Sequence, residues 1–127
     1  MTHYITKNEI QQSYYTIYVF GDNLERKGLG GQASIARPFV TCGKAIGIPT
    51  KRKPTMEPDA FFSDKNDEIE AVNQSFLEIE SKQNQGYHII FFPNIGAGLA
   101  ELSRRSPKIH ALIQQFIANF EFKYQKH

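Results

Sequence analysis

The stretch YHIIFFPNIGAGLAEL, residues 87–102, passes from an apolar run into a loop that carries very little side chain. Residues 87–92 are apolar enough to predict a strand buried on both faces, and Pro93 ends that strand because proline lacks an amide donor. Two glycines around one alanine leave the main-chain N–H groups of the loop uncovered, which is typical of a phosphate cradle. Close packing of a helix against the strand is the other interpretation. The residues of the predicted cradle are Asn94, Ile95, Gly96, Ala97, Gly98 and Leu99.

Two further strands are expected earlier in the chain. Residues 14–20, YYTIYVF, are rich in aromatic and β-branched side chains, and residues 44–49, KAIGIP, form a second short apolar run. Each of these runs is followed by a loop with unusual composition. The first loop is rich in glycine, and the second is basic and contains proline.

Helical patterns lie between and after the strands. A short helix is expected over residues 32–37, and a long one after Ser63 or Asp64, either of which is a suitable N-cap. A last helix should begin at Ser106 and Pro107. Strands that alternate with helices predict an α/β sandwich with a largely parallel or mixed central sheet, in one domain over residues 1–127.

Ligands of such sheets bind beyond the carboxyl ends of the strands, where all three loops are expected to lie. In the first loop, Asn23 can hydrogen-bond a ribose or a base edge, and the paired glycines precede a helix start that could receive an anion. A surface loop with turn glycines is the other interpretation. The residues predicted to bind a ligand here are Gly21, Asp22, Asn23, Gly28, Gly30, Gly31, Gln32 and Ala33.

The second loop follows a buried strand and contributes Pro49, Thr50 and Lys51. A lysine in this place can pair with a phosphate, or act as a nucleophile if its pKa is lowered by burial or by neighbouring Arg52 and Lys53. A solvated basic turn is the other interpretation.

Bulk composition limits the class of protein. The chain has 127 residues, 40% of them hydrophobic, and a net charge of +2, which is too small to predict a polyanion-binding surface. Cys42 is the one cysteine, the start lacks the apolar core of a signal peptide, and no apolar run reaches the ~20 residues of a membrane span. We therefore expect a soluble cytoplasmic domain with no membrane partner and no cofactor. The four histidines are scattered without metal-ligand spacing, so no metal is expected.

Taken together, the three loops resemble those of macrodomains, which bind ADP-ribose. PNIGAGLAEL is similar to the segment that wraps the phosphates, DNLERKGLGGQASIAR to the segment where a polar residue precedes a glycine-rich turn, and PTKRKP to a lysine-containing loop. VFGDNLERKGLGGQA and GIPTKRKP also resemble short, often phage-encoded proteins of this kind. The resemblance covers residues 17–117. It implies a three-layer α/β/α sandwich with a mixed central sheet that binds ADP-ribose or a related nucleotide.

The lysine loop resembles the macrodomain branch that removes ADP-ribose from glutamate side chains, and related antitoxins that remove it from DNA. The resemblance implies that Lys51 attacks or stabilises the ribose C1″ position and that Asn23 or Asp22 holds the distal ribose. ADP-ribosylated protein or DNA would then be a partner. The protein-directed branch carries an aspartate where this chain has Ala100, with Glu101 one residue later.

That difference supports an alternative function without catalysis. The chain would sequester an ADP-ribose-type signalling nucleotide, as a phage anti-defence protein could, or read ADP-ribosyl marks. A nucleic-acid-binding protein that uses residues 51–53 and nearby aromatic side chains is a third hypothesis, which the small net charge disfavours.

Overall fold

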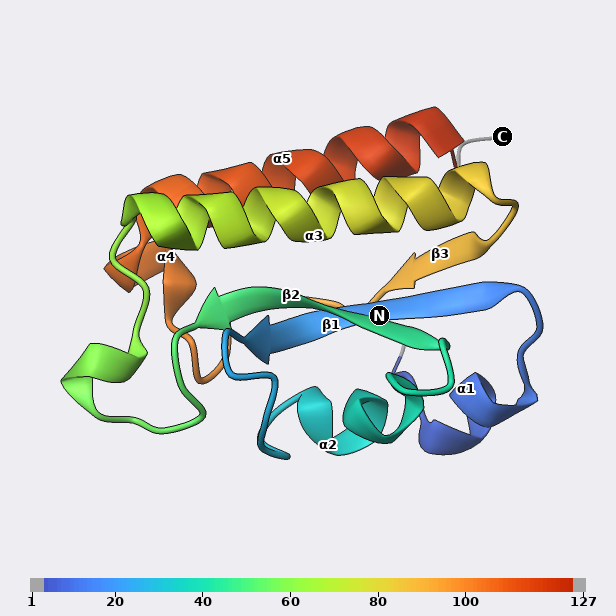
Figure 1. The fold of residues 1–127 in the computed structure, drawn as a ribbon, viewed down its shortest axis with the longest axis horizontal. Helices are drawn as coiled ribbons and strands as arrows, with labels where there is room; N and C mark the ends of the chain where they lie inside the picture. Colours follow the sequence, from blue (N-terminus) through green and yellow to red (C-terminus); the bar gives the residue numbers. More distant parts are fainter. Residues whose placement is uncertain (1–3, 125–127) are drawn as a thin grey trace.

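The computed structural model describes residues 4–124, which form a parallel sheet covered by helices. Figure 1 shows α3 and α5 side by side on one face of the sheet, and α1 and α2 near its other face. The strands are β1 (Thr16–Asn23), β2 (Ala45–Lys51) and β3 (His88–Phe91). The helices are α1 (Lys7–Gln12), α2 (Ala33–Ala36), α3 (Asn66–Asn84), α4 (Leu102–Arg105) and α5 (Pro107–Tyr124), with 3-10 turns at Arg37–Phe39 and Pro58–Ala60.

The sheet has the strand order β2-β1-β3, and both described pairings are parallel. The expectation of a mixed sheet is therefore wrong for the described residues, while the α/β class is confirmed. The reason is the connectivity, because α2 lies between β1 and β2 and α3 lies between β2 and β3. A crossover through a helix returns the chain to the same end of the sheet and so makes neighbouring strands parallel.

Two strands continue further than their apolar patterns predicted. β1 extends through Gly21 to Asn23, and β2 extends to Lys51, because Asp22 and Asn23 still pair with Pro49 and Lys51. β2 is an edge strand, a place where a proline such as Pro49 costs no ladder hydrogen bond. The third strand is shorter than predicted, and the expectation of burial on both faces is wrong, because only Ile89 is buried in β3.

The core includes buried residues of the two long helices and, near the other face of the sheet, Ile10 of α1 and Ala33 and Ala36 of α2. Phe76 of α3 and Phe116 of α5 stack with ring centroids 4.0 Å apart, and Phe91 of β3 meets Phe116 edge-on at 6.3 Å. Val72 and Ile79 continue the buried stripe of α3, as the helical spacing predicted. No helix within residues 4–124 is long and apolar enough to cross a bilayer.

The expectation that Ser63 or Asp64 is the N-cap of α3 is wrong, because Lys65 occupies that position. Asp64 instead accepts hydrogen bonds from the Ser106 hydroxyl and from the amides of Lys108 and Ile109, at the start of α5. Burial opposes ionisation of this carboxyl, yet these hydrogen bonds together outweigh it and lower the pKa of Asp64. One aspartate thus fixes the connection before α3 to the first turn of α5.

Candidate functional site

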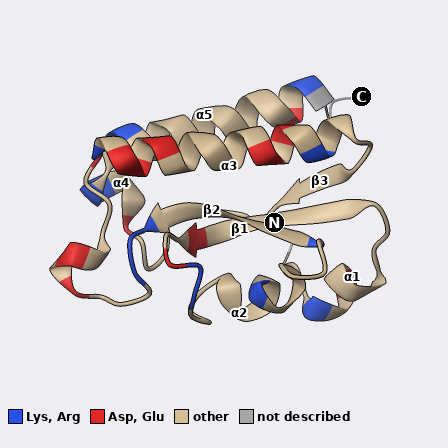
Figure 2. Ribbon diagram, in the orientation of Figure 1, with Lys and Arg blue, Asp and Glu red and all other residues tan. Residues whose placement is uncertain are grey.

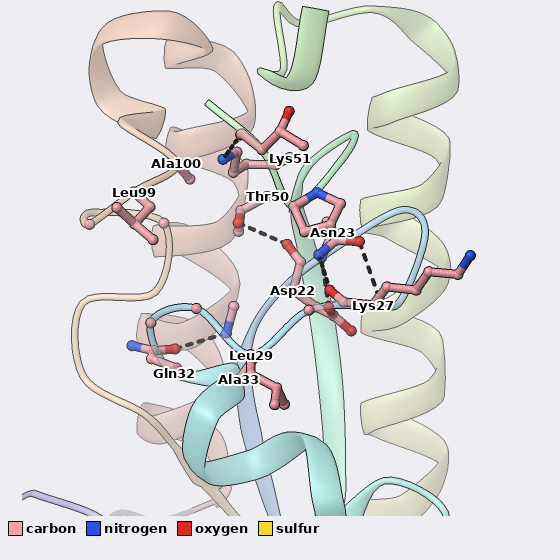
Figure 3. A pocket seen from close by; sticks show the side chains of 18 of the residues that line it. Asp22, Asn23, Lys27, Leu29, Gln32, Ala33, Thr50, Lys51, Leu99 and Ala100 are labelled. Atoms are coloured by element: carbon pink, nitrogen blue, oxygen red, sulfur yellow. Dashed lines mark hydrogen bonds between the residues drawn. The ribbon is translucent and has the colours of Figure 1, made fainter. Parts of the chain in front are cut away.

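A cavity of about 230 Å³ opens where the carboxyl ends of β1 and β2 meet the loop after β3. Three segments line it together with the strand ends, and they are named loop 1 (residues 24–32), loop 2 (residues 52–57) and loop 3 (residues 92–101). Figure 3 shows side chains of loop 1, of loop 3 and of the ends of β1 and β2 around one space, and Pro54, Thr55 and Met56 of loop 2 also line it. The expectation that the three loops meet at one sheet edge is therefore confirmed.

Most of the residues predicted to bind a ligand line this pocket. Pro49 does not, because it lies within β2 opposite Asp22, and Ile95 does not, because its side chain is buried in the core. Ala97 is exposed but lies outside the lining. The predicted residues that line the pocket are Gly21, Asp22, Asn23, Gly28, Gly30, Gly31, Gln32, Ala33, Thr50, Lys51, Asn94, Gly96, Gly98 and Leu99.

Several glycines are explained by close contact between the loops themselves. A Cβ on Gly28 would lie 2.8 Å from Cβ of Pro54, so loop 2 packs directly on loop 1. A Cβ on Gly30 would lie 3.3 Å from Cδ1 of Leu99, so loop 3 also packs on loop 1. The lack of a side chain at Gly28 and Gly30 therefore allows loops 2 and 3 to pack closely on loop 1.

Loop 3 needs only one of its two glycines for its own conformation. Gly96 has a φ of +87°, and a Cβ there would lie 2.7 Å from Cδ2 of Leu102. Gly98 has an ordinary φ, and a Cβ there would meet no atom of residues 4–124 within 4 Å. No close contact within residues 4–124 therefore requires a glycine at position 98, which lies in the lining of the pocket.

Two runs of pocket-lining residues carry main-chain amides without an acceptor. Within residues 4–124, the N–H groups of residues 28–31 in loop 1 and 98–100 in loop 3 donate to no main-chain or side-chain acceptor. Free amide groups in successive residues attract anions. The sequence predicted an anion site at the start of a helix after the paired glycines. Because α2 has only four residues, the amides that could receive an anion are those of the loops.

Asp22 lies beneath loop 1 and is held by arginines. Its carboxylate accepts hydrogen bonds from Arg37 at 2.5 and 2.9 Å and from Arg26 at 3.3 Å, and its side chain is 2% exposed. Arg37 also donates to the carbonyls of Lys27 and Gly28. The pair therefore fixes the shape of loop 1 and neutralises the negative charge of Asp22.

Two amide side chains hold loop 1 in place. The Gln32 side chain accepts from the Gly21 amide at 2.8 Å and donates to the Pro93 carbonyl at 2.6 Å, joining β1, loop 1 and loop 3. The Asn23 side chain donates to the Lys27 carbonyl at 2.7 Å and closes the first turn of loop 1. Both residues line the pocket, and their side-chain hydrogen bonds also hold the segments that surround it.

A β-bulge brings Lys51 to the pocket. Asp22 pairs with Pro49 but Asn23 pairs with Lys51, so Thr50 is the extra residue, and its hydroxyl donates to the Asp22 carbonyl at 3.0 Å. Bulges are common next to binding sites because they redirect side chains. The 7% exposed Lys51 donates from Nζ to the Thr55 carbonyl, and Nζ lies 3.5 Å from the Met56 sulfur.

The environment of Lys51 disfavours its charged form. Burial lowers the pKa of Lys51, Glu101 raises it in part, and Arg105 lowers it again. The predicted contribution of Arg52 and Lys53 is wrong, because those side chains pair with Asp67, Glu68 and Asp59. Lys51 and Arg105 both lie over the ring of Phe61, with Lys51 Nζ 4.9 Å and Arg105 Cζ 3.6 Å from its centroid.

Comparison with known families places this arrangement in a family without an assigned function. DUF7831, described as a family of unknown function, matches residues 1–116, a span that contains all three loops. The chain belongs to DUF7831. No significant match was found among curated proteins or among solved structures.

Several lining residues of the DUF7831 chain were not among the predicted ligand-binding residues. Lys27 and Leu29 lie within the glycine-rich loop, Ala100 follows the predicted cradle, and Pro54, Thr55 and Met56 form the turn that covers Lys51. A single residue in an irregular loop produces no periodic pattern. Their only sequence signal is proximity to the glycines and to Lys51.

Several charged side chains next to the DUF7831 pocket are paired with one another. Figure 2 shows Lys and Arg on the segments that follow β1 and β2, with acidic positions nearby. The Glu101 carboxylate is held by Arg104 and Arg105, whose hydrogen bonds lower its pKa. Among residues 4–124, no three His, Cys, Asp or Glu side chains gather in a way that could hold a metal ion.

Proposed function

We propose that the DUF7831 chain is a macrodomain-like protein that binds ADP-ribose or a related nucleotide in this pocket. The diphosphate would lie against the free amides of loops 1 and 3. The observation that carries the proposal is the meeting of two amide-bearing glycine loops and a buried lysine at the carboxyl edge of a parallel sheet. Ligands of α/β folds bind at that edge.

Electrostatics around the pocket also support an anionic ligand. The one carboxylate in the lining, Asp22, is already neutralised by Arg37 and Arg26. Lys27 and Lys51 are the other charged residues of the lining, and both are basic. An entering diphosphate would therefore meet amide donors and basic side chains without an unpaired negative charge.

Gly98→Ala tests the binding proposal because Gly98 lines the pocket and the added methyl group would lie within 4 Å of no atom of the described protein. We expect the affinity for ADP-ribose, measured by calorimetry, to fall about tenfold or more, with an unchanged melting temperature. Ala97→Ser is the matched control, since it adds one heavy atom to the same loop outside the pocket. Equal affinities for both variants and wild type, or no binding of ADP-ribose by wild type, would contradict the proposal.

A second candidate function is hydrolysis of an ADP-ribosyl bond, with Lys51 as the nucleophile or electrostatic stabiliser at the ribose C1″ position. The observation that favours it is the burial of Lys51, which lowers its pKa and so increases the fraction of uncharged, nucleophilic amine at neutral pH. The hydrogen bond to the Thr55 carbonyl fixes the amine at the pocket wall.

Lys51→Ala tests this chemistry on ADP-ribosylated protein and on ADP-ribosylated DNA. We expect release of ADP-ribose at least tenfold slower than with wild type. Lys53→Ala is the matched control, because Lys53 is in loop 2 but pairs with Asp59 away from the cavity. Equal release by wild type and Lys51→Ala would remove the hydrolase.

If ADP-ribose binds but none is released from ADP-ribosylated protein or ADP-ribosylated DNA, the protein is a non-catalytic binder, as Ala100 in loop 3 suggests. It would then sequester a signalling nucleotide or read ADP-ribosyl marks. The nucleic-acid hypothesis is less well supported, since Arg52 and Lys53 of the basic cluster are occupied by ion pairs with acidic side chains. Binding to DNA that falls steeply with salt would favour it.

A further inference from the structure

Each of the three loops contributes one exposed apolar side chain to the lining of the same pocket. Leu29 of loop 1 is 65% exposed, Met56 of loop 2 is 53% exposed and Leu99 of loop 3 is 54% exposed. Large apolar side chains at this exposure lose favourable burial energy unless something covers them. We name these three residues the apolar rim.

The rim is attached to the polar parts of the pocket. Leu99 packs closely on Gly30, which follows Leu29 directly in the chain. The Met56 sulfur lies 3.5 Å from Nζ of Lys51. A ligand in contact with the loop amides or with Lys51 is therefore close to at least one rim side chain. Figure 3 shows Leu29 and Leu99 from two different loops bordering the cavity.

The size of the cavity indicates that a ligand would extend to this rim. The cavity measures about 230 Å³, and sites for small molecules usually measure roughly 300–1,000 Å³. A nucleotide whose phosphates lie against the loop amides would not fit entirely inside. Its remaining part would have to lie at the mouth, where the apolar rim is.

We infer that the apolar rim binds the nucleobase of the ligand, and that the pocket selects phosphorylated compounds carrying a flat, weakly polar group over phosphate compounds without one. This inference rests on the proposed function. A base offers two apolar faces for leucine side chains, and a methionine sulfur makes favourable contacts with aromatic rings. The rim would thus distinguish ligands with a base from ligands without one, which the main-chain amides cannot do because they contact only the phosphates.

The test compares wild type with Leu29→Ser, Met56→Ser and Leu99→Ser. Leu77→Ser is the matched control, because Leu77 is 60% exposed on α3 and lies outside the pocket lining. Binding of ADP-ribose, and of inorganic pyrophosphate as a probe without a base, is measured by calorimetry up to millimolar concentration. Thermal melting of each variant verifies that it is folded.

We expect wild type and Leu77→Ser to prefer ADP-ribose over pyrophosphate by more than about tenfold, and each rim variant to lose most of that preference. The inference is overturned, with the proposed function intact, if wild type binds ADP-ribose and the rim variants bind it equally well. It is also overturned if the rim variants lose affinity for pyrophosphate and ADP-ribose in equal proportion. If wild type binds no ADP-ribose, the proposed function and the inference fail together.

Discussion

Asp22→Ala is expected to lower the free energy of unfolding by about 3 kcal/mol or more, measured by denaturant titration. The Asp22 carboxylate is almost completely buried and accepts from both Nη atoms of Arg37, from Arg26 and from the Asn23 amide. Its removal leaves the guanidinium of Arg37, only 17% exposed, without its acidic partner. Loss of one member of a buried ion pair is more costly than loss of an exposed pair, because the remaining charge stays desolvated.

The same substitution should reduce ligand binding by a separate route. Arg37 also holds the carbonyls of Lys27 and Gly28, so loop 1 depends on the position of this side chain. The control is Asp59→Ala, which removes a 66% exposed carboxylate paired with Lys53. That variant should remain close to wild type in stability, since exposed pairs contribute little. Similar losses for the two variants would show that the Asp22 pair is not a structural anchor.

Glu68→Ala is expected to have an effect of similar size, about 3 kcal/mol, on the free energy of unfolding. Glu68 is fully buried in the first turn of α3 and accepts from the amides of Ser63 and Lys65, at 2.8 and 3.0 Å. Its second oxygen accepts from Nε of Arg52 at 2.6 Å. Alanine would remove all three hydrogen bonds and leave the amides before α3 without an acceptor.

Asp67→Ala provides the matched control for Glu68. Asp67 is the neighbouring residue and pairs with the same Arg52, but its side chain is 62% exposed. We expect little change in stability, because solvent replaces its interaction with the guanidinium. A loss for Asp67→Ala as large as that for Glu68→Ala would mean that Arg52 pairing, and not burial of Glu68, stabilises this corner. Arg52 follows Lys51 directly, so the corner also positions the lysine of the pocket.

The location of the site could be predicted because its signals are local. Apolar runs end in glycines or in a lysine at three places, and the carboxyl ends of alternating strands meet at one edge. The strand pattern of residues 16–20 and the helical spacing of α3 both reflect burial, whereas Tyr14 and Tyr15 of the predicted strand are exposed and precede β1. Such burial produces a periodic pattern of apolar residues within a single strand or helix, so it can be recognised from the local sequence.

The interactions that fix the site could not be predicted, because they join residues far apart in the chain. Gln32 reaches the Pro93 carbonyl across 61 positions, and Asp64 reaches the start of α5 across more than 40. Nothing in the local sequence distinguishes Gln32 from a solvated side chain. The reason for each glycine was hidden in the same way, since Gly28 depends on Pro54 of another loop.

The central position of β1 has a consequence for how the protein folds. Its partners β2 and β3 follow it at very different distances along the chain, and Thr16 pairs with His88. Such pairings have high contact order, and the entropy of closing the intervening chain must be lost before they form. The edge where the three loops meet is complete only after β3 has joined the sheet. A nascent chain that ends before β3 would therefore lack the pocket, which would form only once β3 pairs with β1.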